Sequence, residues 1–317
     1  MSGGLAGSIS QAAANTAFLA KGDEIFNRPK ESTYGIFTDT VQCDGEFLEL
    51  DTVGPPPAIE EIVGSRLFSA LRLYARRDRV KRWGPKAIEI SRLKVEQNKN
   101  GSITKRLTDY LGTGNFMESP VWAALMGNPV GIDGVALLHD SHPHGNAGAT
   151  WDNKVTDALT PDTFNTGIAA MASLRFETGV PAGFYPTHLF VGPDLEKMAR
   201  DLCENPLRPF PMAATGLEAY ASAVAATAIP NQFAGRIQAV VSPYFIDGTN
   251  EDSWLLMDLS KPGVRPIVVG EALAPMAVAV TDPQAECMVY RSSYQYYAEA
   301  QASIGGFCPY GIYGKLG

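Results

Sequence analysis

The sequence predicts a mixed α+β fold, and three observations support this class. Segments with helical and strand-like patterns alternate in mid-chain, where residues 160–174 and 194–202 have helical periodicity on either side of a buried-strand candidate at residues 188–191. The chain of 317 residues is long enough to bury a large core in one or two domains. The last third is dominated by short strand-like segments, at residues 237–241, 254–257, 266–269, 276–280 and 287–290.

Composition restricts the class of protein. A hydrophobic content of 45% and a charged content of 19% are ordinary for a globular protein. No apolar run approaches the roughly 20 residues that a membrane span needs, and residues 1–11 lack the basic and apolar regions of a secretory signal. Cys43, Cys203, Cys287 and Cys308 have neither metal-binding nor disulfide-rich spacing. We therefore expect a protein that folds in the cytosol without a membrane or disulfides.

The N-terminal third begins with material that cannot form a core alone. Residues 1–35 are rich in Ala, Ser and Gly, and they predict an arm with one short helix at residues 12–20. Alternating polarity within residues 34–52 predicts a strand, which the Gly-Pro-Pro-Pro run at residues 54–57 ends.

Charge is distributed unevenly along the chain. Residues 66–106 hold thirteen Lys or Arg residues against Asp78, Glu89 and Glu96, a net charge of +10 in a chain of net charge −8, which leaves −18 elsewhere. This basic segment could be solvated, could bind nucleic acid, or could dock on acidic groups of another copy. Docking is favoured, because only Tyr74 and Trp83 could stack on bases.

The basic segment is predicted to form a β-hairpin. Apolar and polar residues alternate at residues 71–74, and residues 75–82 are almost all charged. After Trp83-Gly84-Pro85, which supplies turn chemistry, alternation returns at Ile88 and Ile90, and a shift of the pattern indicates a bulge near Ser91, before Leu93 and Val95. Two strands with a charged tip are marginal in water. We expect the hairpin to pack on a neighbouring subunit.

Helices are predicted after the hairpin. Ser102 can cap a helix, Gly112-Thr113-Gly114 interrupts it, and Ser119-Pro120 opens a second piece that runs to Met126, so two pieces end to end are favoured over one kinked helix. Thr160-Pro161 opens a further helix. The apolar face of that helix is formed by Phe164, Ile168, Met171 and Leu174.

A histidine-rich loop is the strongest candidate for chemistry. Its potential metal ligands are His139, Asp140, His142 and His144. Zinc sites usually take ligands from separate elements or from one helix face, so a turn whose side chains bond the backbone is favoured. No nucleophile motif or phosphate-binding loop is complete. The sequence therefore favours a protein that is not an enzyme and has no cofactor or metal.

The order of these elements resembles the major capsid proteins of tailed phages, which have the Hong Kong 97-like fold, and most closely the Mu-like major head subunit family. The resemblance covers residues 34–317. The motifs that carry it are IVGSR at residues 62–66, LLHDSHP at 137–143, GN at 145–146, WLLMD at 254–258, YYAEA at 296–300, GGF at 305–307 and YG at 310–311.

The resemblance implies an α+β Hong Kong 97-like capsid fold with an extended β-hairpin loop that reaches over a neighbouring subunit. It divides the chain into an N-terminal arm (1–35), an extended-loop region (36–98), a peripheral domain with a spine helix (99–175), an axial domain (176–285) and a C-terminal return to the peripheral domain (286–317). The expected intersubunit contacts are Arg72, Arg76, Arg77, Arg79, Lys81, Arg82 and Lys86.

The implied function is that of a structural major capsid protein, which self-assembles into an icosahedral phage or prophage shell around double-stranded DNA. Its expected place is the virion capsid, assembled in the host cytoplasm. Its expected partners are further copies in hexamers and pentamers, a portal, a decoration protein and DNA on the inner face. A separate scaffold is also expected, because no cleavable scaffolding segment precedes residue 1.

Three alternatives remain open from the residues. An encapsulin-like shell would enclose protein cargo instead of DNA. A metal-dependent enzyme would use the His139–His144 loop. A nucleic-acid-binding protein would use the basic segment.

Overall fold

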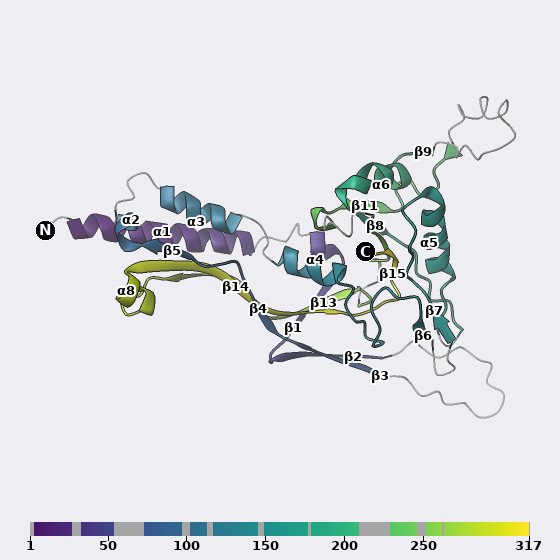
Figure 1. The fold of residues 1–317 in the computed structure, drawn as a ribbon, viewed down its shortest axis with the longest axis horizontal. Helices are drawn as coiled ribbons and strands as arrows, with labels where there is room; N and C mark the ends of the chain where they lie inside the picture. Colours follow the sequence, from purple (N-terminus) through teal and green to yellow (C-terminus); the bar gives the residue numbers. More distant parts are fainter. Residues whose placement is uncertain are drawn as a thin grey trace.

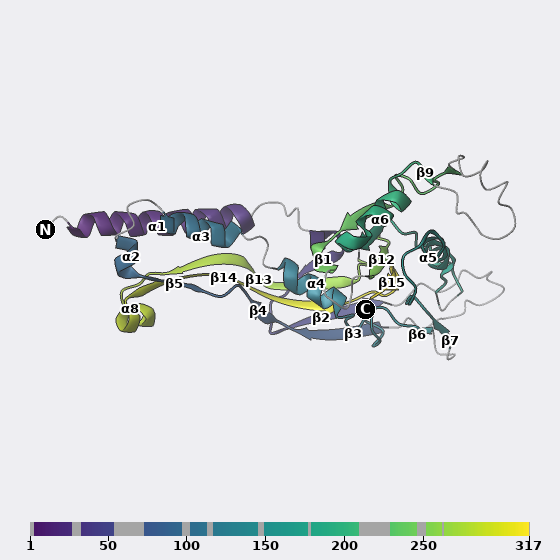
Figure 2. The ribbon, with the colours of Figure 1, turned by 45° about the horizontal axis from the view of Figure 1, so that its top comes forward.

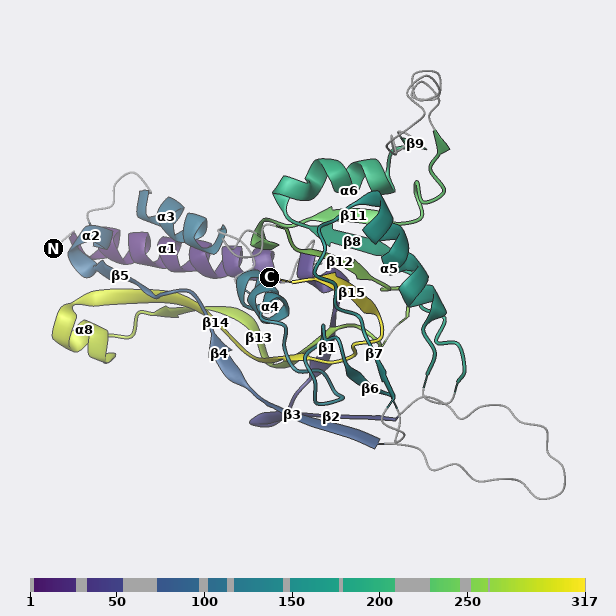
Figure 3. The ribbon, with the colours of Figure 1, turned by 45° about the vertical axis from the view of Figure 1, so that its right-hand side comes forward.

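The molecule is elongated and has two ends of different construction. The computed structural model describes residues 3–26, 33–53, 73–96, 102–112, 117–144, 149–176, 179–208, 229–245, 252–261 and 263–316. At one end, helices α1 and α3 lie along a ribbon formed by two long strands, β13 and β14 (Figures 1 and 2). At the other end, a four-stranded sheet carries helices α5 and α6 (Figure 3).

The long sheet is built around an antiparallel pair of 14-residue strands. Every second residue of β14 from Tyr294 to Ala302 is buried, so one face of the strand is covered throughout. The sheet order is β1-β13-β14-β4, and β5 also pairs with β14. Its elements are β1 (Thr38–Gln42), β4 (Lys81–Trp83), β5 (Ile88–Ser91), β13 (Ile267–Val280), β14 (Ser293–Gly306) and the connecting helix α8 (Glu286–Arg291).

Strand β13 joins two segments that the sequence pattern separates. The predicted strands at residues 266–269 and 276–280 are one strand, whose register against β14 shifts between Glu271 and Met276. Pro275 lies in this irregular stretch, past Glu271, the last residue of β13 that pairs with β1. Its missing N–H therefore removes no hydrogen bond to β1. The predicted strand at residues 287–290 is wrong, because these residues belong to α8.

The N-terminal helix docks on its own chain. Helix α1 (Gly3–Phe26) extends well beyond the predicted residues 12–20 and packs on α3 (Ser102–Gly112) and the long sheet. Phe18 is fully buried between the rings of Tyr110 and Tyr296, with centroid distances of 6.5 and 5.2 Å. The Tyr296 hydroxyl donates to Asn15 Oδ1 at 2.7 Å. Burial raises the Tyr296 pKa to about 12, so this hydroxyl stays neutral.

The four-stranded sheet is buried on both faces. In β8, Phe190 faces the core beside α4, whereas Leu189 and Val191 face the core beside α5 and α6. The N-cap Thr160 and Thr163 form a capping box around Pro161, which confirms the predicted start of α5. The sheet order is β11 (Gln238–Val241), β8 (His188–Val191), β12 (Trp254–Met257) and β15 (Ile312–Lys315), with α5 (Pro161–Ser173) and α6 (Glu196–Cys203) beside it.

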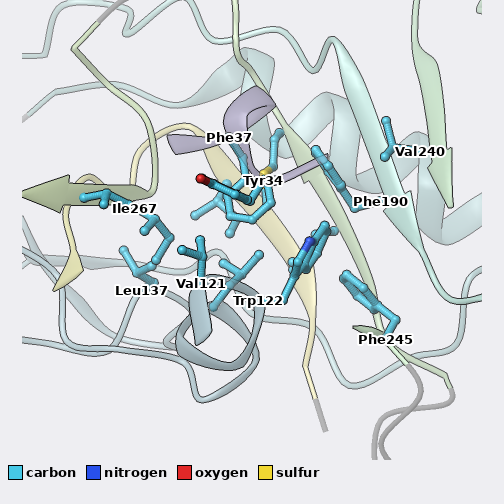
Figure 4. Close-up of a cluster of buried hydrophobic side chains, with 14 of the residues drawn as sticks. Tyr34, Phe37, Val121, Trp122, Leu137, Phe190, Val240, Phe245 and Ile267 are labelled. Carbon is cyan, nitrogen blue, oxygen red and sulfur yellow. The ribbon is translucent and has the colours of Figure 1, made fainter. Parts of the chain in front are cut away.

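One aromatic core joins the two sheets. Trp122 of α4 (Glu118–Met126) packs edge-on against Phe37, Phe190 and Phe245 at centroid distances of 4.7, 6.0 and 5.5 Å (Figure 4). The same cluster includes Ile267 of the long sheet. Helices α3 and α4 are separate, which confirms the two-piece prediction. Short elements complete the described chain: η1 (Thr33–Ile36), α2 (Arg92–Glu96), β6 (His142–His144), β7 (Ala149–Trp151), η2 (Pro193–Leu195), β9 (Leu207–Arg208), β10 (Ile229–Pro230) and η3 (Pro243–Phe245).

The predicted hairpin turn at Trp83-Gly84-Pro85 is wrong. Strand β3 (Leu73–Arg79) pairs antiparallel with the preceding strand β2 (Phe47–Val53), and their connection, residues 54–72, lies outside the described residues. Strands β4 and β5 pair with β14 and not with each other. A Cβ at Gly84 would lie 2.3 Å from the Ala298 carbonyl oxygen, so glycine serves close approach here and not a turn. The predicted returning strand at Leu93 and Val95 is helix α2.

Candidate assembly interface

Five of the seven predicted contact residues lie on two consecutive strands. Arg76, Arg77 and Arg79 belong to β3, and Lys81 and Arg82 to β4. Lys86 lies between β4 and β5, and Arg72 is outside the described residues. These basic residues of β3 and β4 form a row, which we call the basic row. Strands β2 and β4 hold it in place, because Leu48 of β2 packs against Val268 of the long sheet and β4 pairs with β14.

Arg76 is used inside its own chain. Its Nε and Nη2 donate to the two carboxylate oxygens of Asp78 at 2.7 and 2.9 Å. Its Nη1 donates to the carbonyl oxygen of Gly306 at 2.7 Å and to that of Val130. The side chains of Arg76 and Asp78 are only 17% and 18% exposed. Arg76 therefore ties β3 to the end of β14 and to the loop after α4, and little of its guanidinium is open to a neighbour.

The glycine pair at residues 305–306 makes room for this tie. A Cβ at Gly305 would lie 2.2 Å from Asp78 Oδ2, and one at Gly306 would lie 2.6 Å from the Val130 carbonyl oxygen. The Arg76–Asp78 pair was not identified as structural from the sequence. The adjacent glycines near the C-terminus were the signal, because paired glycines in a strand mark a close approach of other groups.

Arg77 and Arg79 stand on the exposed face of β3. Arg77 lies 3.9 Å above the ring of Phe47 and pairs with Glu49 at 3.4 Å. Arg79 pairs with Glu46 at 3.1 Å. The two arginine side chains are 62% and 69% exposed, and their acidic partners on and beside β2 are similarly open. Such exposed pairs contribute little stability, so their guanidinium groups remain available to other acids.

The basic row continues along β4. Arg82 Nη2 donates to Glu299 of β14 at 2.5 Å, and this hydrogen bond raises the Arg82 pKa above its ordinary value. The Arg82 side chain is nevertheless 72% exposed. Lys81 and Lys86 are exposed, and neither has an ion pair with another described residue. Five basic side chains of the predicted set thus project from the surface, and one, Arg76, is internal.

His142 of the histidine-rich loop is engaged by other side chains of the chain. His142 is fully buried, and its ring nitrogens lie 2.6 Å from Asp133 Oδ2 and 3.0 Å from Asn153 Oδ1. His139 Nδ1 accepts the Ser141 N–H at 2.9 Å. Both nitrogens of His142 are therefore occupied by protein groups. The side chain of His144 lies outside the described residues.

None of the helices in the described part of the chain is long and apolar enough to cross a membrane. Within the same residues, no group of three or more His, Cys, Asp or Glu side chains is placed to hold a metal ion.

Comparisons with known proteins agree with the architecture. The structure is similar to the asymmetric unit of the mature capsid of bacteriophage PhiM1, with 11% identity, a TM-score of 0.55, and coverage of 90% of this chain and 87% of that one. The procapsid of bacteriophage JBD30 is similar with 11% identity, a TM-score of 0.51, and coverage of 96% of this chain and 74% of that one. The capsid of the cyanophage P-SCSP1u is similar with 10% identity, a TM-score of 0.53, and coverage of 90% of this chain and 88% of that one. At these identities the likeness shows the fold, which is Hong Kong 97-like.

Sequence comparison supplies the family. No curated protein matches the chain. A family model described as phage capsid protein matches residues 79–298, which is more than half of the chain. The chain therefore belongs to the phage capsid protein family, and it is a structural major capsid protein of an icosahedral shell.

Proposed function

We propose that copies of this chain form the hexamers and pentamers of a phage or prophage head that encloses double-stranded DNA. The observation that carries the assembly mechanism is the exposed basic row on β3 and β4, formed by Arg77, Arg79, Lys81 and Arg82, in a chain whose net charge is −8. Opposite charges on two copies steer their encounter and fix their register. Many weak contacts of this kind stabilise a closed shell together.

We further propose that Arg72 and Lys86 extend this row, and that acidic groups of a neighbouring copy meet it. Within one chain the partners of Arg77 and Arg79 are solvent-exposed, so exchanging them for a neighbour's carboxylates costs little. Arg76 is left out of the proposed interface, because its guanidinium already holds Asp78 and two carbonyl oxygens.

We propose that the chain is divided into domains at the boundaries predicted from the sequence. Residues 1–35 would be the arm, residues 36–98 the extended-loop region, and residues 99–175 the peripheral domain with its spine helix. Residues 176–285 would be the axial domain, and residues 286–317 the return to the peripheral domain. Support comes from α1 and α3, which lie on the long ribbon, and from α6, which lies beside the four-stranded sheet (Figure 1). Two elements cross these boundaries, because α5 also lies beside the four-stranded sheet and β13 lies in the long ribbon.

Charge reversal tests the interface. The triple variant Arg77→Glu, Arg79→Glu and Arg82→Glu should fold and fail to form closed shells, as seen by electron microscopy and sedimentation. The matched control reverses three exposed basic residues elsewhere, Lys154, Lys197 and Arg236, and changes the net charge equally.

The control should assemble as the parent does. Normal particles from the first triple variant would refute the basic row as an interface. Assembly of the parent should also weaken as salt rises toward about 1 M, where the screening length falls to about 3 Å.

The contents of the shell need a separate test. Purified particles should protect double-stranded DNA from nuclease, whereas an encapsulin-like shell would hold protein cargo and no protected DNA. We also propose assembly in the host cytoplasm with a separate scaffold, a portal and a decoration protein, and membership of the Mu-like subfamily. Mass spectrometry of particles stalled before DNA packaging would identify the scaffold directly.

A further inference from the structure

His142 lies where the two sheets meet. Its partner Asp133 belongs to a loop that is tied to the end of the long sheet, because the Ile132 N–H donates to the Phe307 carbonyl at 2.8 Å. Its other partner, Asn153, accepts the Gly314 N–H of β15 through its backbone carbonyl at 3.0 Å. One buried imidazole therefore links a segment held by the long sheet to a segment held by the four-stranded sheet.

The orientation of the Asn153 amide is determined by its neighbours. Its Nδ2 donates to the Leu137 carbonyl at 2.7 Å and to the Pro309 carbonyl at 3.1 Å. Its Oδ1 accepts the His139 N–H at 2.9 Å. The atom that faces His142 Nε2 is therefore an acceptor, so Nε2 must carry a proton.

The second ring nitrogen faces a carboxylate. His142 Nδ1 lies 2.6 Å from Asp133 Oδ2, while Asp133 Oδ1 accepts the Val135 N–H at 3.2 Å. A neutral imidazole with its proton on Nε2 would direct the Nδ1 lone pair at this carboxylate, which is repulsive. The geometry is satisfied when both nitrogens donate, and His142 is then an imidazolium.

The surroundings of the pair contain few other charges. The His142 ring stacks on Trp151 at 4.5 Å, and Trp151 stacks on Tyr310 at 5.2 Å. His139 lies edge-on at 6.0 Å and faces Asp140 at 3.3 Å, near the surface. Cys308 is close to Asp133, and burial raises the pKa of its thiol to about 12, so it stays neutral. Among the described residues, Asp133 is thus the charge in contact with His142, and the Trp151 indole stacks on the imidazole ring.

We propose that the His142–Asp133 pair is a proton-dependent latch between the long sheet and the four-stranded sheet. With the proton in place, the imidazolium bridges Asp133 and Asn153. When rising pH removes the proton, the Nδ1 lone pair meets the Asp133 carboxylate and the bridge becomes repulsive. The stability that the latch adds is therefore present at lower pH and is lost as pH rises through the release of that proton.

The substitution Asp133→Asn separates the latch from other effects of pH. The amide of D133N can donate to Nδ1 of a neutral imidazole and still accept the Val135 N–H, so the bridge no longer needs the second proton. The matched control is Asp140→Asn, the same change in the neighbouring exposed pair with His139.

Thermal unfolding of the unassembled chain, compared between about pH 6 and about pH 9, brackets ordinary histidine titration. The fall in Tm across this interval should be roughly 4–8 °C larger in the parent and in D140N than in D133N. At the higher pH, the amides of Ile132 and Gly314 should exchange faster in the parent than in D133N. Equal Tm profiles in the parent and D133N would overturn the latch.

A direct measurement keeps the proposal testable if D133N does not fold. Nitrogen NMR of the histidine side chains in the parent should show both nitrogens of His142 protonated at about pH 7. A neutral His142 ring at that pH would refute the latch. Both measurements are made without assembly, so they are independent of the proposed basic interface.

Discussion

Replacing Arg76 with methionine tests whether this arginine is an internal tie or a contact between subunits. The substitution keeps much of the side chain's length and removes its donors. Asp78 then loses a bidentate partner, and the carbonyl oxygens of Val130 and Gly306 lose a shared donor. Because the Arg76 and Asp78 side chains are only 17% and 18% exposed, water replaces these bonds poorly.

The magnitude follows from the burial of the pair. Breaking a buried ion pair costs about 3–5 kcal/mol, and the residual exposure of this one lowers the expected loss to about 2–4 kcal/mol. For a chain of this size that corresponds to a fall in Tm of roughly 3–6 °C. Arg77→Met and Arg79→Met are matched controls on the same strand, and each should lower Tm by less than about 2 °C because its ion pair is exposed.

Scanning calorimetry of the unassembled chain measures these differences. The double variant Arg76→Met with Asp78→Leu should recover part of the loss, because it removes the unpaired carboxylate. The reasoning is refuted if Arg76→Met has the same Tm as the control variants and is defective only in assembly. Arg76 would then be an intersubunit residue, as the charge pattern alone had suggested.

Two further predictions concern the packing of the sheets and of helix α1. Gly314→Ala should lower the free energy of unfolding by more than about 3 kcal/mol or prevent folding. The reason is that the φ of Gly314 is 152° and a Cβ there would lie 2.2 Å from the Trp254 carbonyl oxygen of the paired strand. The control Gly45→Ala, where the nearest atom is 3.8 Å away, should change the free energy of unfolding in urea by less than about 0.5 kcal/mol. Phe18→Ala should lower the free energy of unfolding by about 3–4 kcal/mol and speed proteolysis of α1, because the Phe18 ring is fully buried. The control Leu19→Ala, at a side chain that is 40% exposed on the same helix, should lower it by less than about 1 kcal/mol. Equal cleavage of the two variants would show that α1 is not docked through Phe18.

The misplaced hairpin shows a limit of pattern reasoning. Strand β5 alternates in polarity because it pairs with β14 over a half-buried surface, and alternation does not reveal the partner of a strand. Gly84 followed by proline has the composition of a turn. Its role is instead to let the chain pass close to Ala298, a residue more than two hundred positions away.

The histidine loop shows the same limit for chemistry. Alternating histidine and aspartate suggested metal ligands, and the aspartate nearest in sequence, Asp140, faces His139. The partner of His142 is Asp133, nine residues earlier, and Asn153, eleven residues later, completes the bridge. Neither residue belongs to the motif, so the sequence pattern contained no sign of the pair.

The sequence by itself determines properties that depend on neighbouring residues, such as helix ends, and properties of the whole composition, such as net charge. The start of α5 at Thr160-Pro161 and the separation of α3 from α4 depend on neighbouring residues, and both were predicted. The charge imbalance and the family motifs are likewise written along the chain. Tertiary structure decided which strands pair and which basic residues are already used. Arg82 meets Glu299 across 217 positions, and Arg76 meets Gly306 across 230. Partners at such separations are selected by the packing of the whole core, and no local pattern encodes them.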